Sequence, residues 1–327
     1  MTDARAYPLA DFPDRLDRPT LVFLGVTTGG SSIQRLFPAW AAALGLDAQL
    51  VGLDLPVEAP AADIDAAVAR IAADPAIRGA LVTTHKISVH RHAAGRFTAF
   101  DRWAAALGEV GCITKDGRGL LTGRAMDPVT AGLALDRLVP AGHWRRFPAA
   151  GALILGAGGA GVALAAHLLG RAEGDGPAAI RLTDMSEDRL AAAAAHLAPL
   201  AGGRDLAFAP VAGAEATTLY LTGLAPGSLV ANATGLGKDR PGSPLADGAP
   251  LPFDGVAWEF NYRGALTFLA QTRAQAEAKR LTVGDGWLYF LYGWSAVIAA
   301  VFGLDLDAAA MARLEQAAEP FRPGPAA

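Results

Sequence analysis

The chain has 327 residues, of which 52% are hydrophobic and 18% charged, and its formal net charge is −4. This balance excludes an intrinsically disordered chain, and the length is more than one hydrophobic core usually serves, so we expect two domains. The mild negative charge, without any run of Lys or Arg, argues against nucleic acid as a partner.

The cysteine content and the N-terminal residues bear on the compartment. Cys112 is the single cysteine, so an internal disulfide is excluded, which is typical of a reducing environment. The first residues lack the basic-then-apolar pattern of a secretory signal, and no apolar stretch is long enough to cross a bilayer. We therefore expect a cytoplasmic protein without a membrane partner.

The first part of the chain alternates between strand and helix patterns. Apolar runs predict strands at 20–25, 48–53 and 79–83, and helical spacing predicts helices at 33–44, 61–73 and 97–107. Two further strands, 109–114 and 119–122, flank a turn and predict a hairpin. Asp127 followed by Pro128 is typical of a helix start, with Asp127 as the N-cap. This order predicts a mostly parallel sheet with crossover helices.

From about residue 150 the alternation begins again. Strands are predicted near 151–155, 179–183, 206–209, 229–232 and 256–259, with later helices at 266–280 and 287–302. Strands that alternate with helices in this way predict a second, doubly wound sheet.

A glycine cluster follows the first strand of this second half. Gly156, Gly158 and Gly161 fit the pattern G-x-G-x-x-G between a predicted strand and a predicted helix. Glycines at such a turn let the backbone approach a ligand closely, and the helix start offers N–H groups to a pyrophosphate. Asp184 ends the next strand, 23 residues after Gly161, at the spacing of a ribose-binding carboxylate. These residues predict a dinucleotide site.

Seven markers in order resemble the shikimate dehydrogenase family along nearly the whole chain. They are Ser31-Ser-Ile, Val82-Thr-Thr-His-Lys86, Asp127, the glycine turn at 156–161, Asn232-Ala-Thr-Gly-Leu-Gly237, Tyr262-Arg-Gly-Ala-Leu-Thr267 and Asp285-Gly286. The resemblance implies a two-domain α/β protein. A three-layer substrate domain with a mostly parallel sheet would span 1–127 and be completed by helices within 287–327. A Rossmann NAD(P)-binding domain would span 128–286.

The same resemblance implies an oxidoreductase that interconverts a secondary alcohol and a ketone, with roles for individual residues. Lys86, expected in a loop at a strand end, and Asp127 would be catalytic, and Ser31, Ser32, Thr83 and Tyr262 would bind substrate. The implied cofactor-binding residues are Gly156, Gly158, Gly159, Ala160, Gly161, Asp184, Asn232, Thr234, Gly237 and Gly286. Because no carboxylate joins His85, His90 and His92 at ligand spacing, we expect no metal.

Asp184 favours NAD over NADP, since a carboxylate accepts hydrogen bonds from ribose hydroxyls and repels a 2′-phosphate. Family members that prefer NADP tend to carry Asn-Arg-Thr where this chain has Thr183-Asp-Met. Arg181 and Arg189 keep the alternative open, because either could reach a phosphate.

The positions that read substrate in the family differ here. Ile33 stands in place of a serine, Val82 of a threonine, Gly111 of an asparagine and Gly293 of a glutamine. Because each lost hydrogen-bond partner weakens binding, we expect a different small hydroxylated, alicyclic carboxylic acid or a cyclitol as substrate. One alternative is an authentic shikimate or quinate dehydrogenase, and another is a non-catalytic NAD-binding sensor. Beyond this small molecule we expect a monomer or homodimer.

Overall fold

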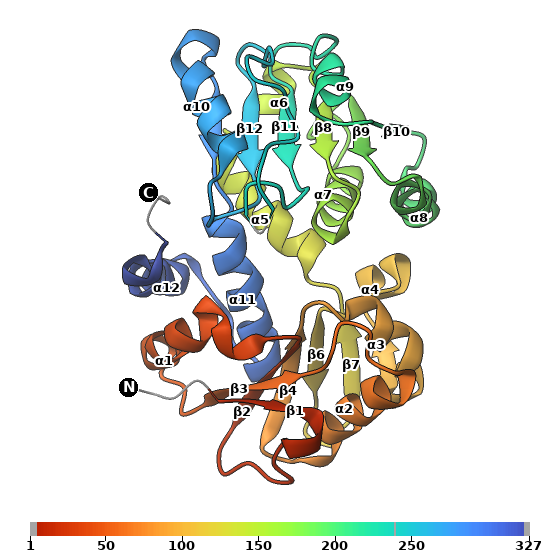
Figure 1. The fold of residues 1–327 in the computed structure, drawn as a ribbon. Coiled ribbons are helices and arrows are strands. Elements are labelled where there is room, and N and C mark those ends of the chain that lie inside the picture. Colours follow the sequence, from red (N-terminus) through yellow and green to blue (C-terminus); the bar gives the residue numbers. More distant parts are fainter. Residues whose placement is uncertain (1–4, 239, 324–327) are drawn as a thin grey trace. The chain divides into compact units, whose positions relative to one another are not determined.

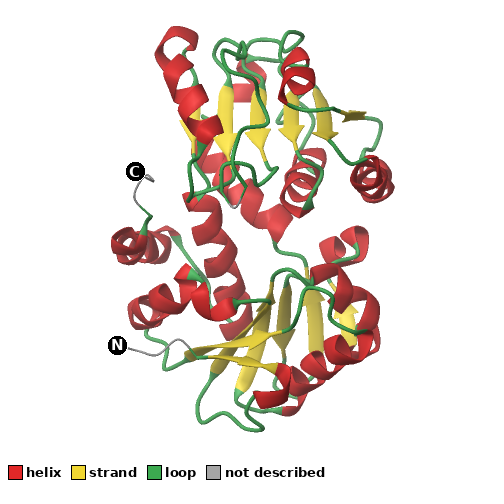
Figure 2. Cartoon of the chain, in the orientation of Figure 1, coloured by secondary structure: helices red, strands yellow, loops and turns green. Residues whose placement is uncertain are grey.

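A computed structural model describes residues 5–238 and 240–323, and the chain divides into two compact units (Figure 1). The first unit comprises the described residues up to Met126 together with Gly293–Arg322, and the second comprises Asp127–Tyr292 together with Pro323. The boundaries expected from the sequence lie after residues 127 and 286, so Asp127 falls in the second unit. Each unit contains one sheet with helices beside it, and the α/β fold class is confirmed (Figure 2).

The first unit is built on a seven-stranded sheet of order β1-β3-β2-β4-β6-β7-β5. The strands are β1 (Ala6–Pro8), β2 (Thr20–Gly25), β3 (Gln49–Asp54), β4 (Ile77–Val82), β5 (Phe97–Phe100), β6 (Cys112–Lys115) and β7 (Leu121–Arg124). Four neighbouring pairs are parallel, whereas β6 runs antiparallel to both β4 and β7. The sheet is therefore mostly parallel, and β6 and β7 form the predicted hairpin.

Helices cover both faces of this sheet. They are α1 (Ser32–Leu44), α2 (Ala61–Ala73), α3 (Lys86–His92), α4 (Arg102–Leu107), the part of α11 (Trp287–Phe302) after residue 292, and α12 (Ala308–Ala318). Because side chains alternate along a strand, Val22 and Leu24 pack with α2 and α3 in one core. Phe23 on the other face meets Trp294 of α11 edge to face, with ring centroids 4.9 Å apart. The expected three layers are present.

Residues 97–107, predicted as one helix, instead form β5 and α4. Two phenylalanines and Thr98 favour a strand, which pairs in parallel with β7. Asp101 then ends the strand and caps α4, since its Oδ1 accepts a hydrogen bond from Ala104 N at 2.7 Å. The helical spacing of the apolar residues was thus outweighed by strand pairing that the sequence does not display.

The second unit contains six parallel strands in the order β10-β9-β8-β11-β12-β13. They are β8 (Ala152–Leu155), β9 (Ala179–Asp184), β10 (Asp205–Pro210), β11 (Leu229–Asn232), β12 (Val256–Glu259) and β13 (Thr282–Gly284). Numbered along the unit, this order is 3-2-1-4-5-6, the doubly wound arrangement of Rossmann sheets. The strand order reverses between β8 and β11, and a crevice at the carboxyl ends of these strands is where such sheets bind ligands.

The helices of the second unit connect and cover these strands. They are α5 (Asp127–Leu138), α6 (His143–Arg146), α7 (Gly159–Leu169), α8 (Glu187–Leu197), α9 (Ala214–Leu219), α10 (Thr267–Lys279) and the first residues of α11. One core cluster joins Leu153 and Val230 of the sheet to Phe268 of α10. The helix predicted at Asp127 is present, although Asp127 is its first residue rather than the N-cap.

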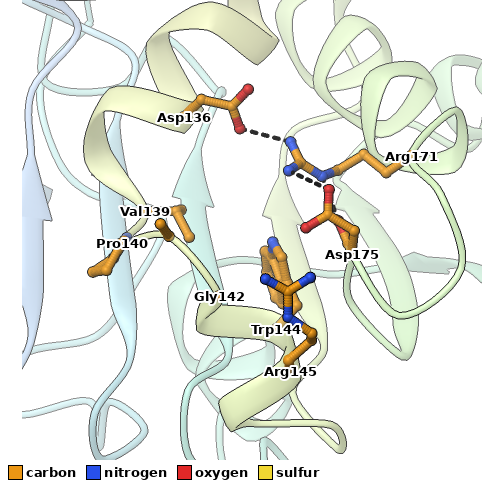
Figure 3. Close-up of a pocket in the computed structure, with 9 residues that line it drawn as sticks. Asp136, Val139, Pro140, Gly142, Trp144, Arg145, Arg171 and Asp175 are labelled. Carbon is orange, nitrogen blue, oxygen red and sulfur yellow. Dashed lines mark hydrogen bonds and ion pairs between the residues drawn. The ribbon is translucent and has the colours of Figure 1, made fainter.

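A cavity of about 300 Å³ lies at the amino-terminal edge of this sheet, beside the segments that lead into β8 and β9 (Figure 3). Arg171 pairs there with Asp136 at 2.7 Å and with Asp175 at 3.0 Å. The charged side chains that line this cavity thus largely satisfy one another, and the cavity lies on the edge opposite the glycine turn. Among the described residues, no helix has the length and apolar character needed to cross a membrane.

Candidate functional site

The turn after β8 requires glycine at two positions. Gly156 has a φ of +105°, and a Cβ there would lie 2.8 Å from the carbonyl oxygen of Ala233. A Cβ on Gly161 would lie 2.0 Å from the carbonyl oxygen of Gly156. By contrast, no atom lies within 4 Å of a Cβ built on Gly158 or Gly159, so the turn is open on that side. The backbone of this turn is thus tightly packed at Gly156 and Gly161 and accessible at Gly158 and Gly159.

Helix α7 begins directly at this opening. Gly158 is its N-cap in an extended conformation, and Gly159 and Ala160 are its first residues. The first N–H groups of a helix have no partner within the helix and carry its positive dipole end. A pyrophosphate placed before α7 would therefore meet both donors and a favourable field.

Asp184 at the end of β9 is held by several donors at once. Its carboxylate accepts hydrogen bonds from Ala157 N and Ser186 N, each at 2.9 Å, and from Arg189 Nη2 at 2.6 Å. Burial would raise the pKa of Asp184, but the Arg189 guanidinium and the two main-chain donors outweigh burial and hold this pKa below its ordinary value. Asp184 is therefore a carboxylate at neutral pH, and Arg189 covers it.

A cavity of about 280 Å³ joins these residues at the carboxyl edge of the sheet. Among the predicted cofactor-binding residues, Gly156, Gly158, Asp184 and Thr234 line it. Sequence reasoning missed Met185, Val211, Leu236 and Arg240, which also line it. Met185 and Val211 directly follow β9 and β10, so their position after a parallel strand was the signal that could have identified them. Arg181, in contrast, stacks on the ring of Tyr220 and does not line the cavity.

The loop after β11 is held by Asn232, which is fully buried. Its Oδ1 accepts hydrogen bonds from Thr234 N at 3.1 Å and from Thr234 Oγ1 at 2.7 Å. Its Nδ2 donates to Glu259 Oε2 at 2.7 Å. Gly237 closes the loop with a φ of +84°, and its N–H donates to Arg240 O at 2.7 Å. Asn232 and Gly237 thus shape the cavity wall, although neither lines it.

Tyr262 and Gly286 lie beyond β12 in the same unit. The Tyr262 ring packs against Phe290 of α11, with centroids 4.6 Å apart. A Cβ on Gly286 would lie 2.0 Å from the carbonyl oxygen of Phe260, so a glycine is needed where α11 begins. The structure thus gives Gly286 a packing role before α11.

In the first unit, Ser31 and Ser32 begin α1. Ser31 is the N-cap, and its side chain makes no capping hydrogen bond. Gln34, in the same turn, is 8% exposed, and its Nε2 has no hydrogen-bond partner among the described residues. A buried donor left unsatisfied costs about 1–3 kcal/mol. The first turn of α1 therefore carries an unused donor that sequence reasoning missed.

Lys86 follows β4 and is the first residue of α3, not part of a loop as expected. The helix starts there because Val89 N donates to His85 O at 2.8 Å. A Cβ built on Gly111 would lie 3.4 Å from Lys86 Cε and 3.6 Å from its Nζ. Thr83 turns its hydroxyl back toward Leu24 O at 3.3 Å. Lys86 therefore lies along the space that a side chain at position 111 would fill.

Comparison with known proteins shows which solved structures share the fold of this chain. No family model and no curated protein matches the sequence. Shikimate 5-dehydrogenase from Thermus thermophilus, in complex with NADP(H) and shikimate, is similar over 93% of this chain and 99% of its own, with 24% identity and a TM-score of 0.68. Quinate dehydrogenase from Corynebacterium glutamicum, in complex with NAD, is similar over 93% of this chain and 100% of its own, with 19% identity and a TM-score of 0.73. The fold is that of the shikimate dehydrogenases.

A third solved structure with the shikimate dehydrogenase fold has another substrate in its name. The ligand-free 5-ketofructose reductase of a Gluconobacter strain is 20% identical over 92% of this chain and 99% of its own, with a TM-score of 0.67. The fold thus carries enzymes named for different hydroxylated substrates. Substrate choice must therefore be argued from the side chains of this chain.

The structure also defines the arrangement of possible metal ligands and the state of the cysteine thiol. Among the described residues, no three His, Cys, Asp or Glu side chains gather in a group that could hold a metal ion. Cys112 is buried in β6, and burial raises the pKa of its thiol to about 12. Because the thiolate is the reactive form, Cys112 is not a nucleophile at neutral pH.

Proposed function

We propose that the chain is an NAD(P)-dependent oxidoreductase that interconverts a secondary alcohol and a ketone on a small hydroxylated molecule. The observation that carries this proposal is the cavity at the carboxyl edge of the second sheet. It combines an open glycine turn, a helix start and an ionised Asp184 in the arrangement that a dinucleotide needs. The shared fold supports it, since neighbours with this fold are dehydrogenases named with NADP(H) or NAD.

Lys86 and Asp127 are proposed as the catalytic pair. Hydride transfer to a nicotinamide leaves a proton on the alcohol oxygen, which a positioned side chain must accept. As a neutral amine Lys86 can accept this proton, the resulting ammonium can then stabilise charge on the oxygen, and Asp127 can orient the substrate hydroxyl. Ser31, Ser32, Thr83 and Tyr262 are proposed to bind substrate, together with the Gln34 amide in the first turn of α1.

The substrate is proposed to be a cyclitol, or an alicyclic hydroxy acid other than shikimate. The positions that differ from the family pattern support this, because Gly111 and Ile33 offer no hydrogen bond where the family carries Asn and Ser. The atoms nearest a Cβ built on Gly111 belong to Lys86, whose side chain carries no amide. Shikimate binding would lose about 1–3 kcal/mol for each unmet hydroxyl.

NAD is proposed as the preferred cofactor, with Asp184 as the reason. The carboxylate lines the cavity and can accept hydrogen bonds from ribose hydroxyls. Arg189, whose side chain is 55% exposed, is the partner that a ribose would replace. The cytoplasmic location and the monomeric or dimeric state expected from the sequence stay predictions.

The test is a turnover assay on a panel of alcohols. The protein is incubated with NAD⁺ or NADP⁺ and with shikimate, quinate, aminoshikimate or cyclitols, and reduced cofactor is followed by its absorbance. We expect turnover of at least one panel member other than shikimate. Efficient turnover of shikimate would show an authentic shikimate dehydrogenase instead. Tight NAD⁺ binding without turnover of any alcohol would favour the sensor.

A further inference from the structure

The Glu259 carboxyl group ties two loops of the second unit together. Strand pairing places Glu259, at the end of β12, beside Asn232, at the end of β11. Glu259 Oε2 accepts a hydrogen bond from Asn232 Nδ2 at 2.7 Å, and Oε1 accepts one from Asn261 N at 2.8 Å. The Glu259 side chain is fully buried. Each carboxylate oxygen therefore accepts a hydrogen bond, and each bond holds the start of a different loop.

Asn232 connects Glu259 to the cavity wall through further hydrogen bonds. Its Oδ1 accepts the two hydrogen bonds from Thr234, and Thr234 Oγ1 accepts one from Leu236 N at 3.1 Å. Asn261 Nδ2 also donates to Leu236 O at 3.0 Å. Thr234 and Leu236 both line the cavity of about 280 Å³. A continuous set of hydrogen bonds thus runs from Glu259 to the surface that a dinucleotide would meet.

The network fits the ionised form of Glu259. A carboxylate accepts both hydrogen bonds strongly, whereas protonation puts an O–H on one of the two oxygens and makes that oxygen a weaker acceptor toward Asn232 Nδ2 or Asn261 N. Turning the Asn232 amide to accept that O–H would remove Oδ1 from Thr234. Protonation of Glu259 therefore weakens the set of hydrogen bonds that holds residues 234–236.

The surroundings of Glu259 oppose this ionisation. The neighbouring strands β11 and β13 contain no charged residue, and the buried residues of α10 are Phe268, Leu269 and Thr272. Asp285, which precedes α11, adds a like charge. Burial and, to a smaller extent, Asp285 raise the pKa of Glu259 to about 7 against the hydrogen bonds that lower it. The group therefore titrates near neutrality.

We propose that Glu259 is a positioning residue whose ionised carboxylate holds residues 232–236 in the form that walls the dinucleotide cavity. The ligand in this proposal rests on the proposed function, whereas the loop arrangement is a property of the chain alone. As Glu259 becomes ionised, the loop is fixed and the dinucleotide binds more tightly. The expected consequence is an affinity for NAD⁺ that rises as the pH passes through about 7.

The first test measures the dissociation constant of NAD⁺ by titration calorimetry between pH 5.5 and 8.5. We expect Glu259→Gln to weaken binding at pH 8 by about fivefold or more, because an amide cannot accept both hydrogen bonds. Its affinity should also lose the rise near pH 7, and Glu259→Asp should restore part of that rise. The control is Glu277→Gln, which changes an exposed glutamate on α10. Equal affinity and an equal pH profile in native protein and Glu259→Gln would overturn the proposal.

The second test needs no dinucleotide, so it separates this proposal from the proposed function. Amide NMR resonances of Thr234, Leu236 and Asn261 are followed against pH in the ligand-free protein. We expect all three to titrate near pH 7 in the native protein and in Glu277→Gln, and to stop doing so in Glu259→Gln. If the native chain binds neither NAD⁺ nor NADP⁺, the proposed function fails, and titration of these amides still supports the positioning of the loop. If these amide resonances titrate in the same way in the native protein and in Glu259→Gln, or do not titrate in the native protein, the proposed role of Glu259 is overturned.

Discussion

At the scale of single residues, the contact between Gly111 and Lys86 governs where the proposed proton carrier lies. Gly111→Val would add methyl groups beyond a Cβ that already lies 3.4 Å from Lys86 Cε. Because misplacing a catalytic group by about 1 Å costs up to about 100-fold, we expect kcat to fall roughly 10- to 100-fold. The assay is steady-state turnover, with circular dichroism to check folding. Gly95→Val, at a position with no neighbour within 4 Å, is the control, and equal losses in both variants would contradict the prediction.

The proposed preference for NAD⁺ rests on the pair formed by Asp184 and Arg189. Asp184→Asn removes the negative charge that repels a 2′-phosphate and that accepts hydrogen bonds from the ribose hydroxyls. The preference for NAD⁺ over NADP⁺ should therefore fall by about tenfold or more. Arg189→Ala leaves Asp184 uncompensated and should weaken NADP⁺ binding while NAD⁺ binding changes little. Dissociation constants for both cofactors in the three proteins decide this. An unchanged ratio in Asp184→Asn would remove Asp184 from cofactor selection.

The raised pKa of Glu259 also predicts how stability depends on pH. Its pKa in the folded protein is about 7 and its ordinary value is 4.5, so the folded state binds more protons between these values. Stability from this group is therefore full below about pH 4.5 and is lost as the pH rises through 7. The loss amounts to roughly 3 kcal/mol, since each pKa unit corresponds to about 1.4 kcal/mol.

Glu259→Gln cannot titrate and should not show this loss. The difference in unfolding free energy between Glu259→Gln and the native protein should therefore shift in favour of the variant by roughly 3 kcal/mol from pH 4.5 to pH 8. Urea unfolding at several pH values measures it. A difference that is constant with pH would show that Glu259 does not titrate in this range.

Residue roles that depend on local sequence could be predicted, and roles that depend on partners could not. Gly161 follows from one turn, because its close approach is to Gly156 O, whereas the close approach of Gly156 is to Ala233 O after β11, and only the glycine motif pointed to it. Arg189 was expected only as a residue that could reach a phosphate, and its ion pair with Asp184 was not predicted. Glu259 was missed because its partner, Asn232, is 27 residues away and is brought beside it by the register of β11 and β12.

At the scale of elements, α12 is fixed by one buried tryptophan. Trp40 of α1 is fully buried, and its Nε1 donates to Leu314 O at 2.9 Å. Trp40→Phe removes this hydrogen bond and leaves a small cavity, so the free energy of unfolding should fall by about 2 kcal/mol. Urea unfolding measures it. Trp103→Phe, at a buried indole that makes no such bond to α12, should cost less, and a larger loss there would contradict this account of how α12 is held.

Long elements were easier to predict than short ones. The helices at 33–44, 61–73 and 287–302 were found by their apolar spacing, and the structure gives them nearly the same bounds. The three-residue strands β1 and β13 were missed, because so short a run has no periodicity and is defined by its parallel neighbour. The same cause explains β5 within residues 97–107.

At the scale of the whole molecule, the first unit is assembled from two long stretches that are far apart in the sequence. The first unit needs Gly293–Arg322 from the far end of the chain, where Val301 packs against the strand residue Gly79. Apart from Pro323, the described part of the second unit is the single stretch Asp127–Tyr292, and it carries the cavity at the carboxyl edge of its sheet. Sequence patterns could predict two sheets, because each repeats strand and helix. The family resemblance supplied the expectation that the last helices complete the first unit.

The central claim is that this chain transfers hydride between a nicotinamide cofactor and a secondary alcohol, with Lys86 as proton carrier. The most direct measurement is the absorbance of reduced cofactor formed from NAD⁺ and an alcohol of the panel, in native protein and in Lys86→Ala. We predict turnover by the native protein and a rate about 10²- to 10⁴-fold lower in Lys86→Ala, with NAD⁺ binding retained. Absence of turnover by the native protein with every alcohol, or full activity of Lys86→Ala, would contradict the account.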